Sequence, residues 1–204
     1  TLDANLALST DGIRGLFSVI NPNFNNSDNT LFTTVESSSI DKLTKFGYKT
    51  SKYGFKLGTE YEQYEDVFFS PNISVYLEDL KTNSDASSQL QKQSGEYFDI
   101  TSSYAFVIDK RDQKFKTNEG YRTYFSQTIP FVTEDGGLKN TFEYKKYHKF
   151  EDEMIGRISF YLDTINSITD DDVRISKRSF IPSKKLRGFE PGRIGPKDGS
   201  EHIG

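Results

Sequence analysis

The chain has 204 residues, of which 34% are hydrophobic and 27% are charged, and its formal net charge is −4. This near balance argues against a general nucleic-acid-binding protein, and the absence of Cys excludes disulfides, thiolate zinc sites and Cys nucleophiles. The longest apolar run, 104–108, is far shorter than the ~20 residues that a membrane-spanning helix needs. Composition alone is that of an ordinary soluble protein, but it leaves a membrane β-barrel open, because such barrels also lack long apolar runs.

Apolar and polar residues alternate along most of the chain, which is the pattern of strands with one apolar face. In the last alternating segment, Met154, Ile158 and Leu162 share one face, while Arg157 and Asp163 share the other. No segment shows a convincing helical period of 3.6. In chain order, the alternation predicts nine strands, at 2–9, 12–21, 29–38, 50–63, 66–80, 96–109, 119–131, 137–149 and 153–165. Their lengths suit the ~9–11 residues of a tilted membrane strand better than the ~5–6 of a typical soluble strand.

The connections between these strands are uneven. Long polar connections at 39–49 and 81–95 fall on one side of a meander, and the tight turns at 64–65 and 150–152 fall on the other. This asymmetry is typical of outer-membrane barrels, although the medium connection 110–118 lies on the short side. We therefore expect an all-β, transmembrane, antiparallel up-and-down β-barrel; a soluble β-barrel or sandwich also alternates and is the other reading. Aromatic girdles would be formed by Phe68, Phe69, Tyr97, Phe98, Tyr121, Phe131, Tyr147 and Phe150.

The tail, 166–204, is acidic at 170–172, then basic, then rich in Gly and Pro, and predicts a long loop without a strand. Within it, Gly188 follows Arg187 and allows a positive φ and a close backbone approach. The guanidinium of Arg187 stays charged and can bind a carboxylate through two hydrogen bonds. The segment predicts a loop that positions one guanidinium. The alternative is an exposed basic loop without a specific contact. The motif residues are Leu186, Arg187, Gly188, Phe189, Glu190, Ile194, Gly195 and Pro196.

These motif residues resemble the (V/I)-R-G-(F/Y) signature and the trailing I-G-P of BamA-type outer-membrane assembly factors. Two other segments agree in order and spacing. The segment 18–24, which ends in Asn-Pro-Asn-Phe, resembles an N-P-Y-F turn of the family, and 109–122 resembles its D-x-R-D turn without the usual Pro. Leu186 stands where the family signature has Val or Ile, which is a mild departure from it. The resemblance covers essentially the whole chain.

The resemblance implies a barrel of sixteen strands preceded by periplasmic POTRA domains. On that basis residues 1–204 are expected to be a single partial barrel domain, with 2–165 as nine strands and 166–204 as an extracellular loop that folds into the lumen. The chain begins with Thr1 and has one Met, Met154, so we expect it to be a segment of a longer protein. In the family the counterpart of Arg187 pairs with carboxylates on later strands, and we expect Arg187 and Phe189 to hold the loop against the barrel wall in the complete protein.

The implied function is the non-enzymatic insertion and assembly of proteins in the outer membrane of Gram-negative bacteria, without a cofactor. The implied partners are outer-membrane lipids and lipopolysaccharide, client β-barrel proteins, the POTRA domains of the same chain and accessory lipoproteins; nucleic acid is not among them. The alternatives are a related translocation barrel, of the TamA type or of two-partner secretion, and a soluble β-rich binding module or hydrolase.

No residue is expected to be catalytic or to bind a metal or cofactor. The sequence has no G-x-S-x-G, phosphate-loop or H-E-x-x-H motif. The acidic run Asp170, Asp171 and Asp172 could hold a cation among lipopolysaccharide phosphates, but a solvated loop is favoured. His148 is expected at a membrane interface, and His202 is not expected to be a ligand.

Overall fold

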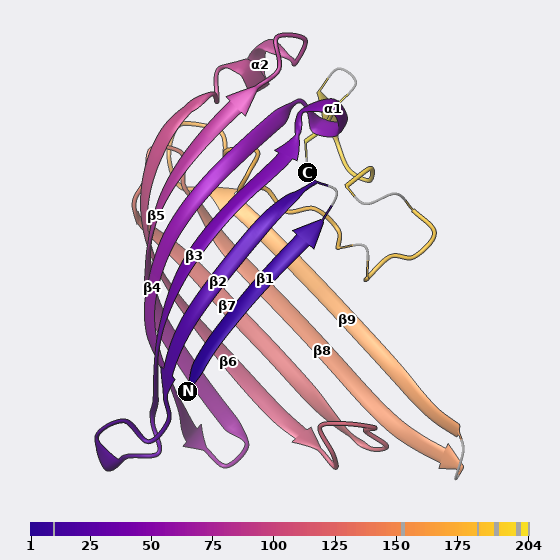
Figure 1. The fold of residues 1–204 in the computed structure, drawn as a ribbon. Helices are drawn as coiled ribbons and strands as arrows, with labels where there is room; N and C mark the ends of the chain where they lie inside the picture. Colours follow the sequence, from indigo (N-terminus) through magenta and orange to yellow (C-terminus); the bar gives the residue numbers. More distant parts are fainter. Residues whose placement is uncertain (10, 152–153, 183, 190–191, 199–200, 204) are drawn as a thin grey trace.

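The computed structural model describes residues 1–9, 11–151, 154–182, 184–189, 192–198 and 201–203. One curved antiparallel sheet dominates it, and each strand is hydrogen-bonded to the next along the chain, from β1 to β9 (Figure 1). The strands are β1 (Leu2–Ser9), β2 (Gly12–Asn21), β3 (Thr30–Lys42), β4 (Tyr48–Tyr64), β5 (Val67–Thr82), β6 (Gly95–Arg111), β7 (Gly120–Val132), β8 (Gly137–Glu151) and β9 (Met154–Ser167). The predicted nine-stranded meander is therefore confirmed.

The sheet has an apolar outer face and a polar inner face. Val35, Phe55 and Val75 lie opposite one another across β3, β4 and β5, and the side chains of Val35 and Phe55 are 51% and 47% exposed. The next row, Glu36, Gly54 and Tyr76, faces the other way. Large apolar side chains remain exposed on the outer face, as expected where a barrel wall contacts lipid. Among the described residues the sheet is open, because β1 and β9 stand at the two ends of the strand order.

Three polar side chains interrupt the apolar outer face. The Tyr104 hydroxyl in β6 donates to Oε1 of Gln127 in β7, at 2.9 Å, and Nε2 of Gln127 donates to Oδ1 of Asn140 in β8, at 2.6 Å. Gln127 lies between Phe125 and Ile129 on this face. We call Tyr104, Gln127 and Asn140 the outer polar ladder.

The structure differs from the sequence expectation in the connections. The connection predicted at 39–49 is shorter in the structure. Strand β3 continues to Lys42 and β4 begins at Tyr48, and a single helical turn, α1 (Leu43–Phe46), joins them. Another turn, α2 (Ser88–Gln91), precedes β6, and a 3-10 turn spans Phe24–Asn26. Such single turns are too short to show a helical period in the sequence. Within the described part of the chain, no helix has the length and apolar character needed to cross a membrane.

The expectation that the tail contains no strand was wrong. Residues Lys197–Asp198 (β10) and Glu201–His202 (β11) pair as a short antiparallel ladder. This ladder brings Ile203 back to the top of the sheet, where it packs against an apolar cluster. The buried members of that cluster are Phe46, Tyr48, Leu80, Leu90 and Ile175. Each such side chain stabilises the fold by ~1.5–3 kcal/mol when fully buried, so the tail is packed against the strand ends that face it.

Candidate functional site: the base of the lumenal loop

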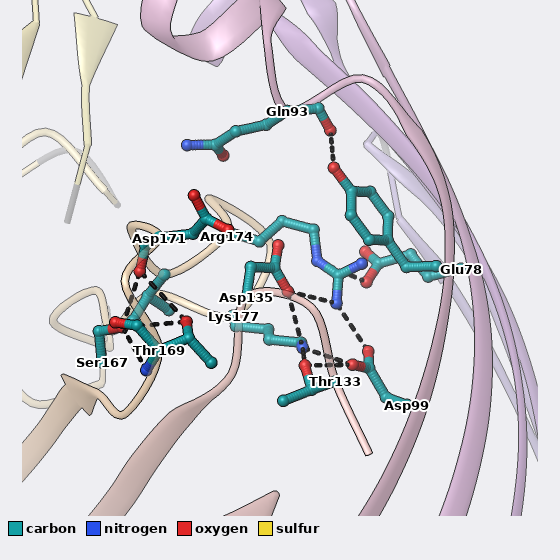
Figure 2. Close-up of polar contacts among 12 residues, drawn as sticks. Glu78, Gln93, Asp99, Thr133, Asp135, Ser167, Thr169, Asp171, Arg174 and Lys177 are labelled. Atoms are coloured by element: carbon teal, nitrogen blue, oxygen red, sulfur yellow. Dashed lines mark hydrogen bonds and ion pairs between the residues drawn. The ribbon is translucent and has the colours of Figure 1, made fainter.

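The segment that follows β9 is fixed to the inner face of the sheet by a buried cation. Arg174 is 0% exposed. Its Nη2 lies 2.6 Å from Oδ2 of Asp99 in β6 and 3.2 Å from Oδ1 of Asp135, while its Nε lies 3.5 Å from Oε2 of Glu78 in β5. The guanidinium carbon stands 3.7 Å from the centre of the Tyr97 ring. Figure 2 shows these side chains converging from the loop and from the sheet.

A second cation from the same segment reaches the same carboxylates. Nζ of Lys177 lies 2.7 Å from Oδ1 of Asp99 and 3.2 Å from Oδ1 of Asp135, and it donates to Oγ1 of Thr133 at 3.1 Å (Figure 2). Thr133 also donates to Asp99 at 2.8 Å. We call Glu78, Asp99, Asp135, Arg174 and Lys177 the loop anchor.

The charges of the loop anchor nearly balance. Its three carboxylates face two cations, and Lys52 of β4 lies directly opposite Glu78 across the sheet. Glu78 is also held by Thr50, whose hydroxyl donates to Oε1 at 2.6 Å. The three carboxylate residues are each less than a tenth exposed. Charges buried in this way are tolerated only when paired and hydrogen-bonded, so each cation depends on the carboxylates that surround it.

Further contacts continue along the loop away from the anchor. The backbone N–H of Ile175 donates to Oε1 of Gln93 at 2.8 Å, and the Ser179 hydroxyl donates to Oδ2 of Asp163 in β9 at 2.7 Å. Lys185 pairs with Glu143 of β8, and its Nζ lies 4.6 Å from the centre of the Tyr161 ring. The loop therefore crosses the inner face from β5 and β6 toward β8 and β9.

The motif predicted from sequence lies beyond these contacts, on an exposed part of the loop. Arg187 is exposed, Leu186 is half-buried and Phe189 is 60% exposed. Gly188 has the expected positive φ, 87°. With the described residues Arg187 forms no hydrogen bond or ion pair, so its pairing with a carboxylate in the complete protein stays a prediction. Glu190 lies outside the described residues.

The trailing part of the motif returns toward the apolar cluster. Gly195 has a φ of 129°, and the Pro196 carbonyl accepts a hydrogen bond from the backbone N–H of Ile203 at 3.0 Å. Ile194 is half-buried. At Gly192 a Cβ atom would lie 2.7 Å from the Phe46 ring, so glycine is needed for this close approach. The three positions Ile194, Gly195 and Pro196 therefore form a turn that leads into the β10–β11 ladder.

The acidic run and the histidines are not assembled into a metal site. Asp170, Asp171 and Asp172 are exposed, and Asp172 accepts a hydrogen bond from Gln89. No group of three or more His, Asp or Glu side chains among the described residues is arranged to hold a metal ion. His148 stacks edge-on against Phe150 at 4.8 Å between ring centres, and His202 is buried in the tail.

Sequence reasoning missed the loop anchor. Arg174 and Lys177 appeared only as part of a basic stretch, and Tyr97 was expected in an aromatic girdle, whereas it faces inward beneath Arg174. Glu78 and Asp99 carried a usable signal, because both lie on the polar face near the same end of adjacent strands. They are diagonal neighbours, since Glu78 pairs with Tyr97 and Asp99 pairs with Tyr76. Two carboxylates so placed indicate that a cation must reach them.

Comparison with known proteins places this geometry in a family. The model of a family described as the Omp85 superfamily domain matches residues 1–204. The chain belongs to the Omp85 superfamily. No curated protein sequence matches the chain. A solved structure of BamA from Haemophilus ducreyi lacking POTRA domains 1–3 superposes with a TM-score of 0.85 and 16% sequence identity, over 96% of this chain and 41% of that one.

This Omp85 chain therefore has the fold of part of a BamA-type barrel, and it spans about two fifths of the length of the solved chain. The membrane-barrel prediction is confirmed over the soluble β-rich alternative, because both the family and the fold agree with it. The loop anchor accordingly lies on the inner face of a barrel wall.

Proposed function

We propose that this Omp85 chain supplies wall and lumenal loop to a barrel that inserts and assembles other β-barrel proteins in the outer membrane of a Gram-negative bacterium. The observation that carries the proposal is the loop anchor, which holds the segment after β9 against the inner face of an Omp85 sheet. A loop fixed in this way narrows the lumen and braces the wall. Such a barrel is suited to assembly more than to the free passage of solutes.

The proposed activity is not enzymatic and uses no cofactor. A strand edge can direct the pairing of an incoming strand through main-chain hydrogen bonds, so assembly proceeds without nucleotide hydrolysis. The partners we propose are outer-membrane lipids and lipopolysaccharide on the outer face, client barrel strands at an edge, and POTRA domains and accessory lipoproteins at the end where β6 and β7 are joined. We propose residues 166–204 as an extracellular loop whose motif, from Leu186 to Pro196, contacts other parts of the complete barrel.

The test uses the complete protein in cells depleted of their own assembly factor. Arg187→Ala should lower the amount of heat-modifiable client barrels at equal protein level, because the loop tip loses the guanidinium proposed to pair with a carboxylate. Lys184→Ala, a nearby exposed cation outside the motif, is the matched control and should support normal assembly. Full assembly by Arg187→Ala would refute the role of the motif. Normal clients together with failed export of a co-expressed passenger protein would instead favour a two-partner secretion barrel.

A further inference from the structure

Cationic side chains gather on the inner face of β6 to β9, at the end opposite the loop anchor. Asp109, Arg122, Lys145 and Ser159 form one row across these four strands. The next row toward the strand ends contains Arg111, Tyr147 and Arg157, and Lys149 follows on β8. These rows share a face with Glu143 and Tyr161, which contact Lys185 of the loop, so they face inward. We call Arg111, Arg122, Lys145 and Arg157 the inner basic cluster.

The carboxylates within the cluster do not balance it. Asp109 is shared between Arg111, whose Nη2 lies 2.6 Å away, and Arg122, whose Nε lies 3.9 Å away. Glu143 is likewise shared between Lys145, at 2.7 Å, and Lys185. Each carboxylate therefore serves two cations. Within the inner basic cluster, the described cations therefore outnumber the described carboxylates that pair with them.

Two features leave cations of this cluster available to a further anion. Arg122 of β7 and Lys145 of β8 lie directly opposite each other, and like charges in that position are destabilising. Arg157 is exposed and forms no hydrogen bond or ion pair with the described residues. A fold that keeps these cations together gains from an anion that joins them.

The distance between the cations indicates what kind of anion can contact them together. Arg122 of β7 and Arg157 of β9 lie two strands and two residues apart, so their backbone positions are separated by ~12 Å. An extended peptide with an acidic residue at every second position presents carboxylates ~7 Å and ~13 Å apart on one face, so two of its carboxylates can reach both cations at once. Membrane lipid is disfavoured, because the cluster faces away from the apolar outer face.

We propose that the inner basic cluster binds an acidic segment of a polypeptide that enters the barrel at the end where β6–β7 and β8–β9 are joined. Arg122 and Arg157 make the principal contacts, since their own carboxylate partners are distant or absent among the described residues. The proposal rests on the proposed function only in taking this end of the barrel as the one that faces the periplasm.

The test measures peptide binding by the complete protein in detergent. The probe is a fluorescein-labelled peptide of alternating Glu and Ser, followed by anisotropy. We expect saturable binding that weakens as salt is raised, and no binding of the matching Gln–Ser peptide. Arg122→Gln with Arg157→Gln should weaken binding by about tenfold or more. The control is Arg14→Gln on the inner face of β2, whose guanidinium already pairs with Glu36 at 2.9 Å, and it should change binding by less than about twofold.

A second measurement keeps the proposal testable if the double variant fails to fold. A photo-crosslinking residue at Ser159, in the row of Arg122, should capture the peptide, whereas the same residue at the outward-facing Ile158 should not. Equal binding of the Gln–Ser peptide, an equal loss in Arg14→Gln, or capture at Ile158 would overturn the proposal. Displacement by millimolar inorganic phosphate would also overturn it in favour of a small-anion site. Because the assay needs no client assembly, its failure is distinguishable from failure of the proposed function.

Discussion

Nη2 of Arg174 lies 2.6 Å from Oδ2 of Asp99, although the two residues are 75 positions apart in the sequence. The contact joins the loop after β9 to the sixth strand of the sheet, and both side chains are shielded from solvent. Removal of one member of such a pair leaves a buried charge without its partner, whereas removal of both can cost little. A single substitution in the loop anchor should therefore lower the stability more than a matched double substitution.

Arg174→Leu should destabilise the barrel by ~3–5 kcal/mol, because Asp99 and Asp135 would then share Lys177 alone and Glu78 would lose its arginine partner. The midpoint of heat-modifiable migration of the complete protein measures this loss. Lys185→Gln is the control: the Lys185 side chain is 30% exposed and Glu143 keeps Lys145 as a partner, so the loss should be only ~0–1 kcal/mol. Addition of Asp99→Leu to Arg174→Leu should restore part of the midpoint; a further drop would contradict the coupling.

The outer polar ladder should stabilise the barrel only when all three of its hydrogen-bonding side chains are present. Gln127→Leu leaves the Tyr104 hydroxyl and the Asn140 amide without partners on an apolar face, which costs ~1–3 kcal/mol for each unsatisfied group. Replacement of all three side chains, as Tyr104→Phe, Gln127→Leu and Asn140→Leu, should recover most of the loss. Thermal midpoints of the purified protein in lipid measure both effects. A triple variant less stable than the single one would contradict this view.

The turn between β6 and β7 should not tolerate a side chain at Gly120. Its φ is 98°, and an added Cβ would lie 2.1 Å from the Lys110 carbonyl oxygen. Gly120→Ala should therefore shift the pairing of β6 with β7 and lower the thermal midpoint. Gly188→Ala is the matched control, because its φ is 87° but no atom lies within 4 Å of the added Cβ. It should show only backbone strain, ~1–2 kcal/mol. Equal effects of the two substitutions would show that the close contact is unimportant.

The same turn should loosen in acid through Asp112. Partial desolvation raises the pKa of Asp112, but hydrogen bonds from the backbone N–H groups of Glu119 and Asn118 outweigh it, so the pKa lies below its ordinary value. A lowered folded pKa means that the contribution of Asp112 is present above the unfolded pKa, ~3.9, and is lost as pH falls through the lowered value.

Hydrogen exchange at the amides of Asn118 and Glu119 reports this loss, since they lie 3.0 Å and 3.2 Å from Oδ1 of Asp112. Protection relative to an unstructured peptide should fall in that acidic window. Asp112→Asn is the control and should show weaker protection without the step in pH. A step that persists in Asp112→Asn would assign it to another group.

The strands could be predicted because one face of the wall is apolar and the other is polar, so the alternation is strong through the middle of each strand. It fades where strands extend beyond the apolar band. Ser37, Ser39 and Asp41 of β3 occupy outward positions that continue from Val35, and the alternation disappears there. The sequence therefore assigned the end of β3 and the start of β4 to a loop.

The loop anchor could not be predicted in the same way, because its members are brought together only by the topology. Arg174 meets Asp99 through the order of the strands, and no local pattern encodes that meeting. The motif around Arg187 is recognisable in the sequence, since it combines a cation, a glycine and an aromatic side chain. In the structure, that motif is exposed and the unremarked Arg174 is buried.

The carboxylates that receive Arg174 come from β5, β6 and the connection before β8, whereas Arg174 itself follows β9. The receiving site does not exist until these strands have paired. A slip of one residue would move Glu78 or Asp99 to the outer face and leave Arg174 without a partner. Docking of the loop therefore depends on the strand register, because only a correctly paired wall brings these carboxylates together.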